Sequence, residues 1–228
     1  MTPSQKLQAK AEDLFAEACR IRGCEVEPVA RGRAKTPDFR VRLGQAKLIA
    51  EVKSPGLEPQ IQQQMKGSSL TLRLTPGKRV RSLIGNSEAQ LAACISDVPK
   101  ILVICDLRHL LPDYPMYPLY GFNDGDLAAG MFGEMVFRCR FQSGRLAHNG
   151  PEFGDNRTLR RNHYTHVSAV ALLLVGQNFQ LGPFRVYHNP FAIRPLPPQS
   201  FQVAGDRQFW PGTEEGQVVF RWEERCVK

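Results

Sequence analysis

Two acidic residues and a lysine occupy matching places on what the sequence predicts to be two consecutive strands, 36–43 and 46–53. Thr36-Pro37-Asp38 opens the first strand, and Glu51-Val52-Lys53 closes the second. Gly44-Gln45 lies between them, and a glycine at the first central position suits a two-residue hairpin turn. This turn places Asp38 directly opposite Glu51, with their Cβ atoms about 5 Å apart. The same register gathers one wholly apolar face from Phe39, Val41, Leu43, Ala46, Leu48, Ala50 and Val52.

Two facing carboxylates repel each other, so the pair requires a compensating cation. Mg²⁺ fits, because it takes oxygen ligands from one or two carboxylates and fills its other positions with water and substrate phosphate. We expect Mn²⁺ to substitute. Lys53 shares the face of Glu51 and can orient or deprotonate a water, or neutralise charge at a scissile phosphate. An acid-x-lysine triplet arises about once in a random chain of this size and by itself indicates only solvated residues, but the matching position of Asp38 favours a metal site.

The elements around these residues follow from apolar periodicity. Thr2, Pro3 and Gln5 form a helix start and Gly23 a stop, with an apolar stripe between them. The sequence predicts helices over 3–22 and 79–96, and strands over 24–29, 100–106, 167–175 and 184–188. No element is assigned within 110–154, and residues from Pro195 onward are expected to be irregular or poorly ordered.

This order of elements, with Thr36-Pro37-Asp38 on one strand and Leu48 to Ser54 on the next, resembles the PD-(D/E)XK nuclease superfamily. The resemblance implies an α/β, restriction-endonuclease-like αβββαβ core over residues 3–106, with a mixed central sheet flanked by helices. Residues 107–228 would form a β-rich extension of a single domain, 1–228. It also implies Mg²⁺-dependent cleavage of DNA, or less often RNA, most simply by an endonuclease. Asp38 and Glu51 would be the metal ligands, and Lys53 would position the attacking water.

Many members of that superfamily carry a further glutamate on the first helix that approaches the metal. By that likeness Glu12 is the candidate third ligand and catalytic residue, and Glu17 competes with it; either could equally be a solvated helix residue. Gln90, on the expected second helix, is a weaker candidate for an assisting polar residue. The stretch 59–76 looks like an insertion, and 107–228 matches nothing in the shared core, so the resemblance does not supply the substrate.

Composition limits the function classes. The chain has 228 residues, 42% of them hydrophobic, which excludes general disorder. The longest apolar run, 167–176, is far short of a membrane span, and the first 20 residues contain no signal-peptide core. Six scattered cysteines without a C-x-x-C pair are typical of reduced thiols. We therefore expect a cytoplasmic protein with no membrane partner.

A formal net charge of +8 favours an anionic partner, and we expect nucleic acid, DNA more than RNA. Basic residues flank the proposed site and could bind backbone phosphates, although each group could equally be solvated charge: Arg31, Arg33, Lys35, Arg73, Lys78, Arg79 and Arg81, and later Arg157, Arg160 and Arg161. His163 and His166 have metal-like spacing but no third ligand nearby. The aromatic stretch 114–122 favours packed cover over base stacking.

Two other functions compete with a nuclease. One is a non-catalytic nucleic-acid-binding module on the same fold, against which the complete set of Asp38, Glu51 and Lys53 argues. The other is a nuclease toxin secreted by a specialised apparatus, which a neighbouring immunity gene would indicate. Any of these three functions is compatible with a homodimer.

Overall fold

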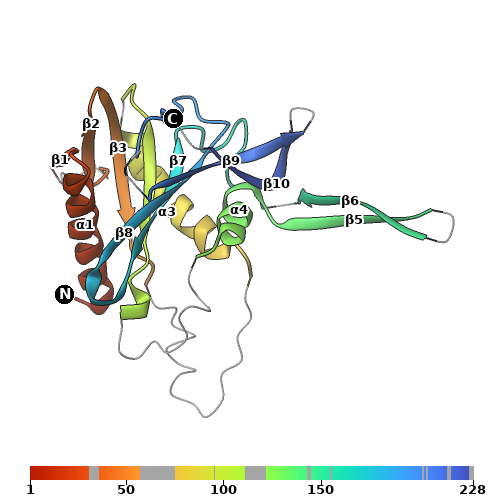
Figure 1. Cartoon of the computed structure of the whole chain (residues 1–228), viewed down its shortest axis with the longest axis horizontal. Coiled ribbons are helices and arrows are strands. Elements are labelled where there is room, and N and C mark those ends of the chain that lie inside the picture. Colours follow the sequence, from red (N-terminus) through yellow and green to blue (C-terminus); the bar gives the residue numbers. More distant parts are fainter. Residues whose placement is uncertain are drawn as a thin grey trace, which may run out of the picture.

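The computed structural model describes residues 1–30, 36–56, 75–94, 96–110, 122–142, 145–154, 156–201, 203, 205–214 and 217–225. It is an α/β structure built on a mixed eight-stranded sheet with the order β1-β2-β3-β4-β7-β8-β9-β10 (Figure 1). The strands of this sheet are β1 (Glu25–Pro28), β2 (Phe39–Leu43), β3 (Ala46–Lys53), β4 (Lys100–Cys105), β7 (Ala169–Val175), β8 (Leu181–His188), β9 (Arg207–Glu214) and β10 (Gln217–Glu224). The helices are α1 (Pro3–Ile21), α3 (Lys78–Ala93) and α4 (Asp124–Phe132), and a separate two-stranded ribbon consists of β5 (Met135–Gln142) and β6 (Arg145–Phe153). The predicted α/β class is confirmed.

Helix α1 begins as its sequence predicts. The Thr2 side chain accepts a hydrogen bond from the Gln5 backbone N–H, and the Gln5 side chain accepts one from the Thr2 N–H. This reciprocal capping box satisfies two donors that a helix start otherwise leaves open. Its apolar stripe, including Leu14 and Phe15, is buried against the sheet.

The predicted hairpin register between β2 and β3 is confirmed. Phe39 pairs with Ala50, and Leu43 pairs with Ala46 across the turn. Gly44 adopts a φ of 58°, a left-handed conformation that glycine reaches without steric cost. The expected strand 36–43 is shorter than predicted, because β2 begins at Phe39 and leaves Asp38 directly before it.

The sheet is covered on both faces (Figure 1). On one side, α1 packs against the face that carries Leu48, Ala50 and Val52, which is the apolar face predicted from the register. On the other side, α3 and α4 pack over Ile49 and Leu102. Successive side chains of β3 point to the two cores in turn. Glu51 shares the face of Ile49 and therefore lies beneath α3.

The C-terminal half differs from the prediction. The region from Pro195 onward was expected to be irregular, but it contains β9 and β10, which continue the sheet beyond β8. Pro211 and Gly212 lie within β9 and obscured its alternating pattern. The region 110–154, in which no element was assigned, contains α4, β5 and β6. Because β7 pairs with β4, the strands β7, β8, β9 and β10 share one sheet with the expected core, whereas β5 and β6 form a sheet of their own.

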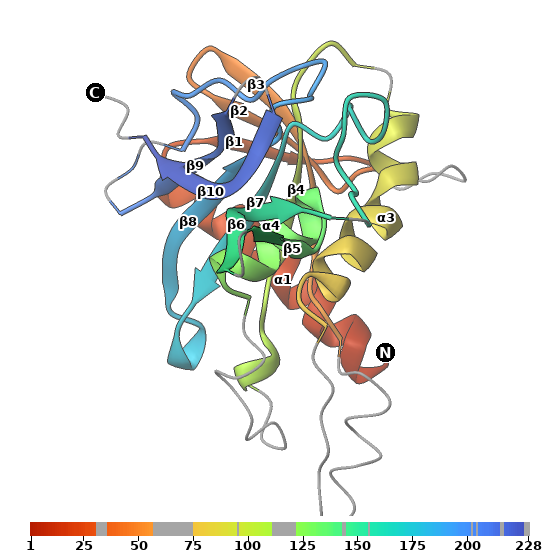
Figure 2. The same cartoon turned by 90° about the vertical axis from the view of Figure 1, so that its right-hand side faces the viewer.

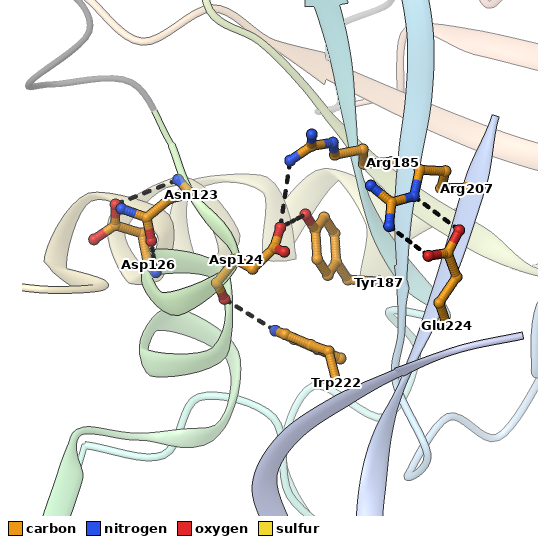
Figure 3. A network of polar contacts seen from close by, with 8 residues as sticks. All are labelled: Asn123, Asp124, Asp126, Arg185, Tyr187, Arg207, Trp222 and Glu224. Atoms are coloured by element: carbon orange, nitrogen blue, oxygen red, sulfur yellow. Dashed lines mark hydrogen bonds and ion pairs between the residues drawn. The ribbon is translucent and has the colours of Figure 1, made fainter. Parts of the chain in front are cut away.

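Helix α4 is tied to the far edge of the sheet (Figure 3). Asn123 caps it, with Asp126 completing a capping box. The Tyr187 hydroxyl donates to Asp124 Oδ1 at 2.5 Å, and Trp222 Nε1 donates to the Asp124 carbonyl at 2.9 Å. Arg185 lies 3.5 Å from the same carboxylate. These contacts from β8 and β10 fix the start of α4.

A buried ion pair joins α1 to the C-terminal half. Arg22 Nη2 lies 2.7 Å from Asp206 Oδ1, and their side chains are 7% and 0% exposed. Asp206 also accepts a hydrogen bond from the Phe184 backbone N–H of β8. Removal of one partner leaves a buried charge unpaired, which is more costly than the loss of the pair as a whole.

We expect Asp206→Ala to lower the free energy of unfolding by about 3 kcal/mol, because it strands the Arg22 guanidinium inside the protein. Asp97→Ala is the matched control, because its ion pair with Arg194 is exposed and should contribute less than about 1 kcal/mol. Urea unfolding followed by circular dichroism measures both. If the two substitutions lowered the free energy of unfolding equally, the buried pair of Arg22 and Asp206 would contribute no more to stability than an exposed ion pair.

Candidate functional site

The predicted carboxylates lie together where β2 and β3 meet. Asp38 precedes Phe39, the partner of Ala50, so its backbone is level with Glu51. Asp38 Oδ2 accepts a hydrogen bond from the Val52 backbone N–H at 2.9 Å, which fixes its carboxylate across the hairpin. Asp38 is half-buried, whereas Glu51 is 0% exposed. The sequence predicted this pairing but not the complete burial of Glu51.

The Glu51 carboxylate is held by one of its two oxygens. Lys53 Nζ lies 2.5 Å from Oε1, and Gln90 Nε2 donates to the same oxygen at 2.6 Å. Gln90 comes from α3, so this helix positions the assisting amide that the sequence suggested. Glu51 Oε2 is buried and has no hydrogen-bond donor in the described part of the chain. A buried carboxylate oxygen without a donor is a free acceptor for a cation.

The burial of Glu51 and its position beside Asp38 change the pKa of its carboxyl group. Burial, followed by the charge of Asp38, raises the pKa of Glu51 to about 7, and Lys53 opposes the shift. Two carboxylates this close cannot both ionise cheaply in the absence of a positive charge. Lys53 is one such charge, and its side chain is 21% exposed. A divalent cation would supply the other.

The donor set fits Mg²⁺. Asp38 and Glu51 offer hard carboxylate oxygens, and Glu51 Oε2 is buried without a hydrogen-bond donor among the described residues. Among the described residues, no three His, Cys, Asp or Glu side chains gather closely enough to form a metal cage. Two carboxylates are sufficient for Mg²⁺, which usually keeps several waters and is completed by substrate phosphate, whereas a structural zinc site would need four protein ligands.

The raised pKa of Glu51 predicts a pH-dependent stability in the metal-free protein. The folded-state pKa lies above the unfolded value of 4.5, so the proton stabilises the folded state and this contribution is lost as pH rises through about 7. From pH 5 to pH 8, wild type should lose roughly 2.5 kcal/mol relative to Glu51→Gln, which cannot ionise. Urea unfolding at both pH values measures the difference. Mg²⁺ should reduce the loss of stability of wild type at pH 8. If the stability of the two proteins depended on pH identically, Glu51 would not have a raised pKa in the folded protein.

The sequence did not identify Gln8, which connects α1 to the end of β3. Its Nε2 donates to the Val52 carbonyl at 2.7 Å, and its Oε1 accepts from the Ser54 N–H at 2.9 Å. The amide therefore continues the backbone pairing of β3 beyond its last residue. Gln8 Nε2 also donates to Glu12 Oε1 at 3.0 Å. The four-residue spacing of Gln8 and Glu12, which places both on one helix face, was the sequence feature that could have indicated this contact.

This contact bears on the two candidate glutamates. Glu12 is half-buried and joined to the site through Gln8, whereas Glu17 is exposed. However, α1 packs on the face of β3 opposite to the one that carries Glu51. Within the described ranges, Glu12 does not complete a three-residue metal cluster with Asp38 and Glu51.

The basic residues expected to flank the site on either side in the sequence differ in where they lie. Arg31, Arg33, Lys35 and Arg73, like most of 59–76 and of the aromatic stretch 114–122, lie outside the described residues. Arg79 donates to the Gly56 carbonyl just beyond β3, which places it beside the site. Arg81 instead donates to the Ala129 carbonyl of α4 and approaches Glu134.

Another buried ion pair, which the sequence did not predict, follows β4. Arg108 is fully buried, and its Nε and Nη2 bind the two oxygens of Asp106 at 2.7 and 2.5 Å. Because β4 runs parallel to β3, with Ile104 paired with Lys53, this pair lies at the same edge of the sheet as the end of β3. His163 and His166, whose spacing alone resembled that of metal ligands, both contact the Tyr164 ring, His163 in a tilted arrangement and His166 at an edge.

Comparison of the chain with protein-family models, with curated proteins and with solved structures finds no match. Over the described residues, no helix combines the length and the apolar character that a membrane span requires.

Proposed function

We propose that the protein is a Mg²⁺-dependent nuclease that hydrolyses phosphodiester bonds, with DNA as the favoured substrate and endonucleolytic cleavage as the favoured mode. One observation carries this proposal: Glu51 lies beside Asp38, fully buried, with one oxygen held by Lys53 and Gln90 and the other without a donor in the described chain. A fully buried carboxylate beside a second carboxylate costs stability, and a buried oxygen without a donor adds to that cost, so the arrangement favours a bound cation.

The arrangement of elements also supports a restriction-endonuclease-like core. Among the described elements, the order α1, β1, β2, β3, α3, β4 is that of αβββαβ, and β4 is parallel to β3 and adjacent to it. The candidate residues come from the paired strands β2 and β3 and from the helix that follows them, so the packed sheet holds them in place.

Each residue has a chemical role in this proposal. Asp38 and Glu51 would hold Mg²⁺, which would polarise the scissile phosphate and lower the pKa of a water. Lys53 is close enough to Glu51 to orient the attacking water or to stabilise the developing negative charge. Gln90 fixes the Glu51 carboxylate, and the Val52 N–H fixes that of Asp38. This positioning removes the cost of arranging the site during the reaction.

A substrate panel tests the proposal. Purified full-length protein is incubated with supercoiled plasmid, linear duplex DNA, single-stranded DNA and RNA, in Mg²⁺ or in EDTA. We expect plasmid nicking or linearisation in Mg²⁺, none in EDTA, and activity in Mn²⁺. Binding without cleavage of any substrate in either metal would instead favour a non-catalytic nucleic-acid-binding module.

A further inference from the structure

The β5–β6 ribbon projects from the body of the molecule, and at its base β6 contacts β10 and Phe153 packs into the core. Its strands pair with each other in a sheet of their own, and Figure 1 shows the ribbon extending away from the main sheet beyond β10. Figure 2, turned by 90°, views it nearly along its length. Eight residues of β5 correspond to about 26 Å of extended chain. A two-stranded ribbon without packing is only marginally stable in water, so we expect the part that projects beyond the packed base to have a partner.

The ribbon sequence is basic. Between residues 135 and 153 there are three arginines, one histidine and one acidic residue, Glu152, which pairs with Val136 at the base of the ribbon. The arginines are Arg138, Arg140 and Arg145. The register brings Arg145 opposite Gln142, and Arg140 opposite Ala147. Charge complementarity therefore favours an anionic partner.

The base of the ribbon is firmly mounted. The Gly154 N–H donates to the Glu134 carbonyl at 2.7 Å, and the Leu159 N–H donates to the Met131 carbonyl at the end of α4 at 2.7 Å. The start of α4 is itself fixed by Tyr187 and Trp222, as Figure 3 shows. The ribbon is thus held at a defined place relative to the sheet.

A cavity of about 550 Å³ opens at this base. Its apolar lining includes Phe132, Phe153 and Phe191, and its polar rim is formed by Arg157, Arg160, Arg161 and Asn162. Arg157 is committed to the carbonyls of Phe153 and Gly154, where β6 ends. Arg160 and Arg161 are exposed, form no ion pair with any described residue, and no acidic residue is among those that line the cavity. Two adjacent arginines therefore have free guanidinium groups at the base of a basic ribbon.

These features match double-stranded DNA. The major groove of B-form DNA is about 12 Å wide and admits a two-stranded β-ribbon, whereas the major groove of A-form RNA is too deep and narrow to do so. Arginines beside an inserted element commonly bind the flanking phosphates and fix its register. We propose that the β5–β6 ribbon lies in the major groove of a DNA duplex, and that Arg160 and Arg161 bind the phosphates beside it. This inference rests on the proposed nuclease function and names its substrate as B-form duplex DNA.

Binding measurements on full-length variants test the inference separately from cleavage. The ribbon variant combines Arg138→Ala, Arg140→Ala and Arg145→Ala, and the base variant combines Arg160→Ala and Arg161→Ala. The charge-matched control combines Arg20→Ala, Arg42→Ala and Arg194→Ala, three exposed arginines on other elements. Fluorescence anisotropy with a DNA duplex, an RNA duplex of the same sequence and the single DNA strand is measured in Ca²⁺ over a salt series.

We expect the ribbon variant to lose at least about tenfold in affinity for duplex DNA relative to the control, with a much smaller loss on duplex RNA and single-stranded DNA. In the base variant, the slope of log affinity against log salt should fall by about 0.9 for each arginine that contacts a phosphate. If circular dichroism shows that the ribbon variant does not fold, the base variant decides the test by its slope on duplex DNA.

Equal losses on all three nucleic acids, or a ribbon variant that binds like the control, would overturn the inference. So would a ribbon variant that loses self-association in sedimentation while it keeps its DNA affinity, because the partner of the ribbon would then be a second copy of the chain. None of these results depends on turnover. Failure of wild type to cleave any substrate in Mg²⁺ would count against the proposed nuclease, while the binding data would still decide the role of the ribbon.

Discussion

Asp38→Asn and Glu51→Gln are each expected to slow Mg²⁺-dependent cleavage by at least about 10³-fold. Loss of one carboxylate ligand removes several kcal/mol of charge stabilisation at the transition state, and each 1.36 kcal/mol corresponds to a tenfold change in rate. Both substitutions keep an oxygen that can accept the existing hydrogen bonds, from Val52 N–H at position 38 and from Lys53 and Gln90 at position 51. The fold should therefore be preserved.

Single-turnover cleavage of plasmid DNA measures this effect. Glu17→Gln is the matched control, because Glu17 is an exposed carboxylate on α1 and should leave the rate unchanged. Circular dichroism and thermal unfolding establish that each variant is folded. A rate close to that of wild type in either Asp38→Asn or Glu51→Gln would remove that residue from the metal site.

Lys53→Ala is expected to lower the cleavage rate by about 10²- to 10⁴-fold while changing duplex affinity in Ca²⁺ by less than about threefold. Only an interaction that is stronger in the transition state than in the bound ground state affects the chemical step in this way. Lys53 also lowers the pKa of Glu51, so its removal should move the acidic limb of the pH–rate profile to higher pH.

Lys47→Ala provides the control for Lys53, because Lys47 lies on the same strand but is exposed and distant from the carboxylate pair. It should alter the cleavage rate little. If Lys53→Ala reduced affinity and rate by the same factor, with no displacement of the pH profile, Lys53 would be a phosphate-binding residue with no role in the chemical step.

The sequence predicted the local part of the site because hairpin geometry is local. Gly44 fixes the turn, the turn fixes the register, and the register brings Asp38 level with Glu51. The burial of Glu51 was not predictable in this way, because it depends on how α3 packs over the sheet. The contact from Gln90 spans 39 positions of the chain, and that from Gln8 to Val52 spans 44.

The second half of the fold was harder to predict for a different reason. The strand β9 contains Pro211 and Gly212, and β6 contains Gly150 and Pro151, residues that usually indicate turns. Helix α4 has only nine residues, and its cap uses aspartate where glutamate or glutamine is the usual partner. Backbone pairing of β9 with β8 and β10 and of β6 with β5, and packing of α4 against β10, outweigh the local preference.

The most direct test of the central claim is metal binding itself. Mn²⁺ binding to the nucleic-acid-free protein at pH 8 can be followed by electron paramagnetic resonance, which counts bound ions without any need for turnover. Wild type is predicted to bind Mn²⁺ at a site that Mg²⁺ competes for, and both Asp38→Asn and Glu51→Gln should abolish that binding while Glu17→Gln retains it. Unchanged Mn²⁺ binding in the two site variants would contradict the assignment of Asp38 and Glu51 as metal ligands.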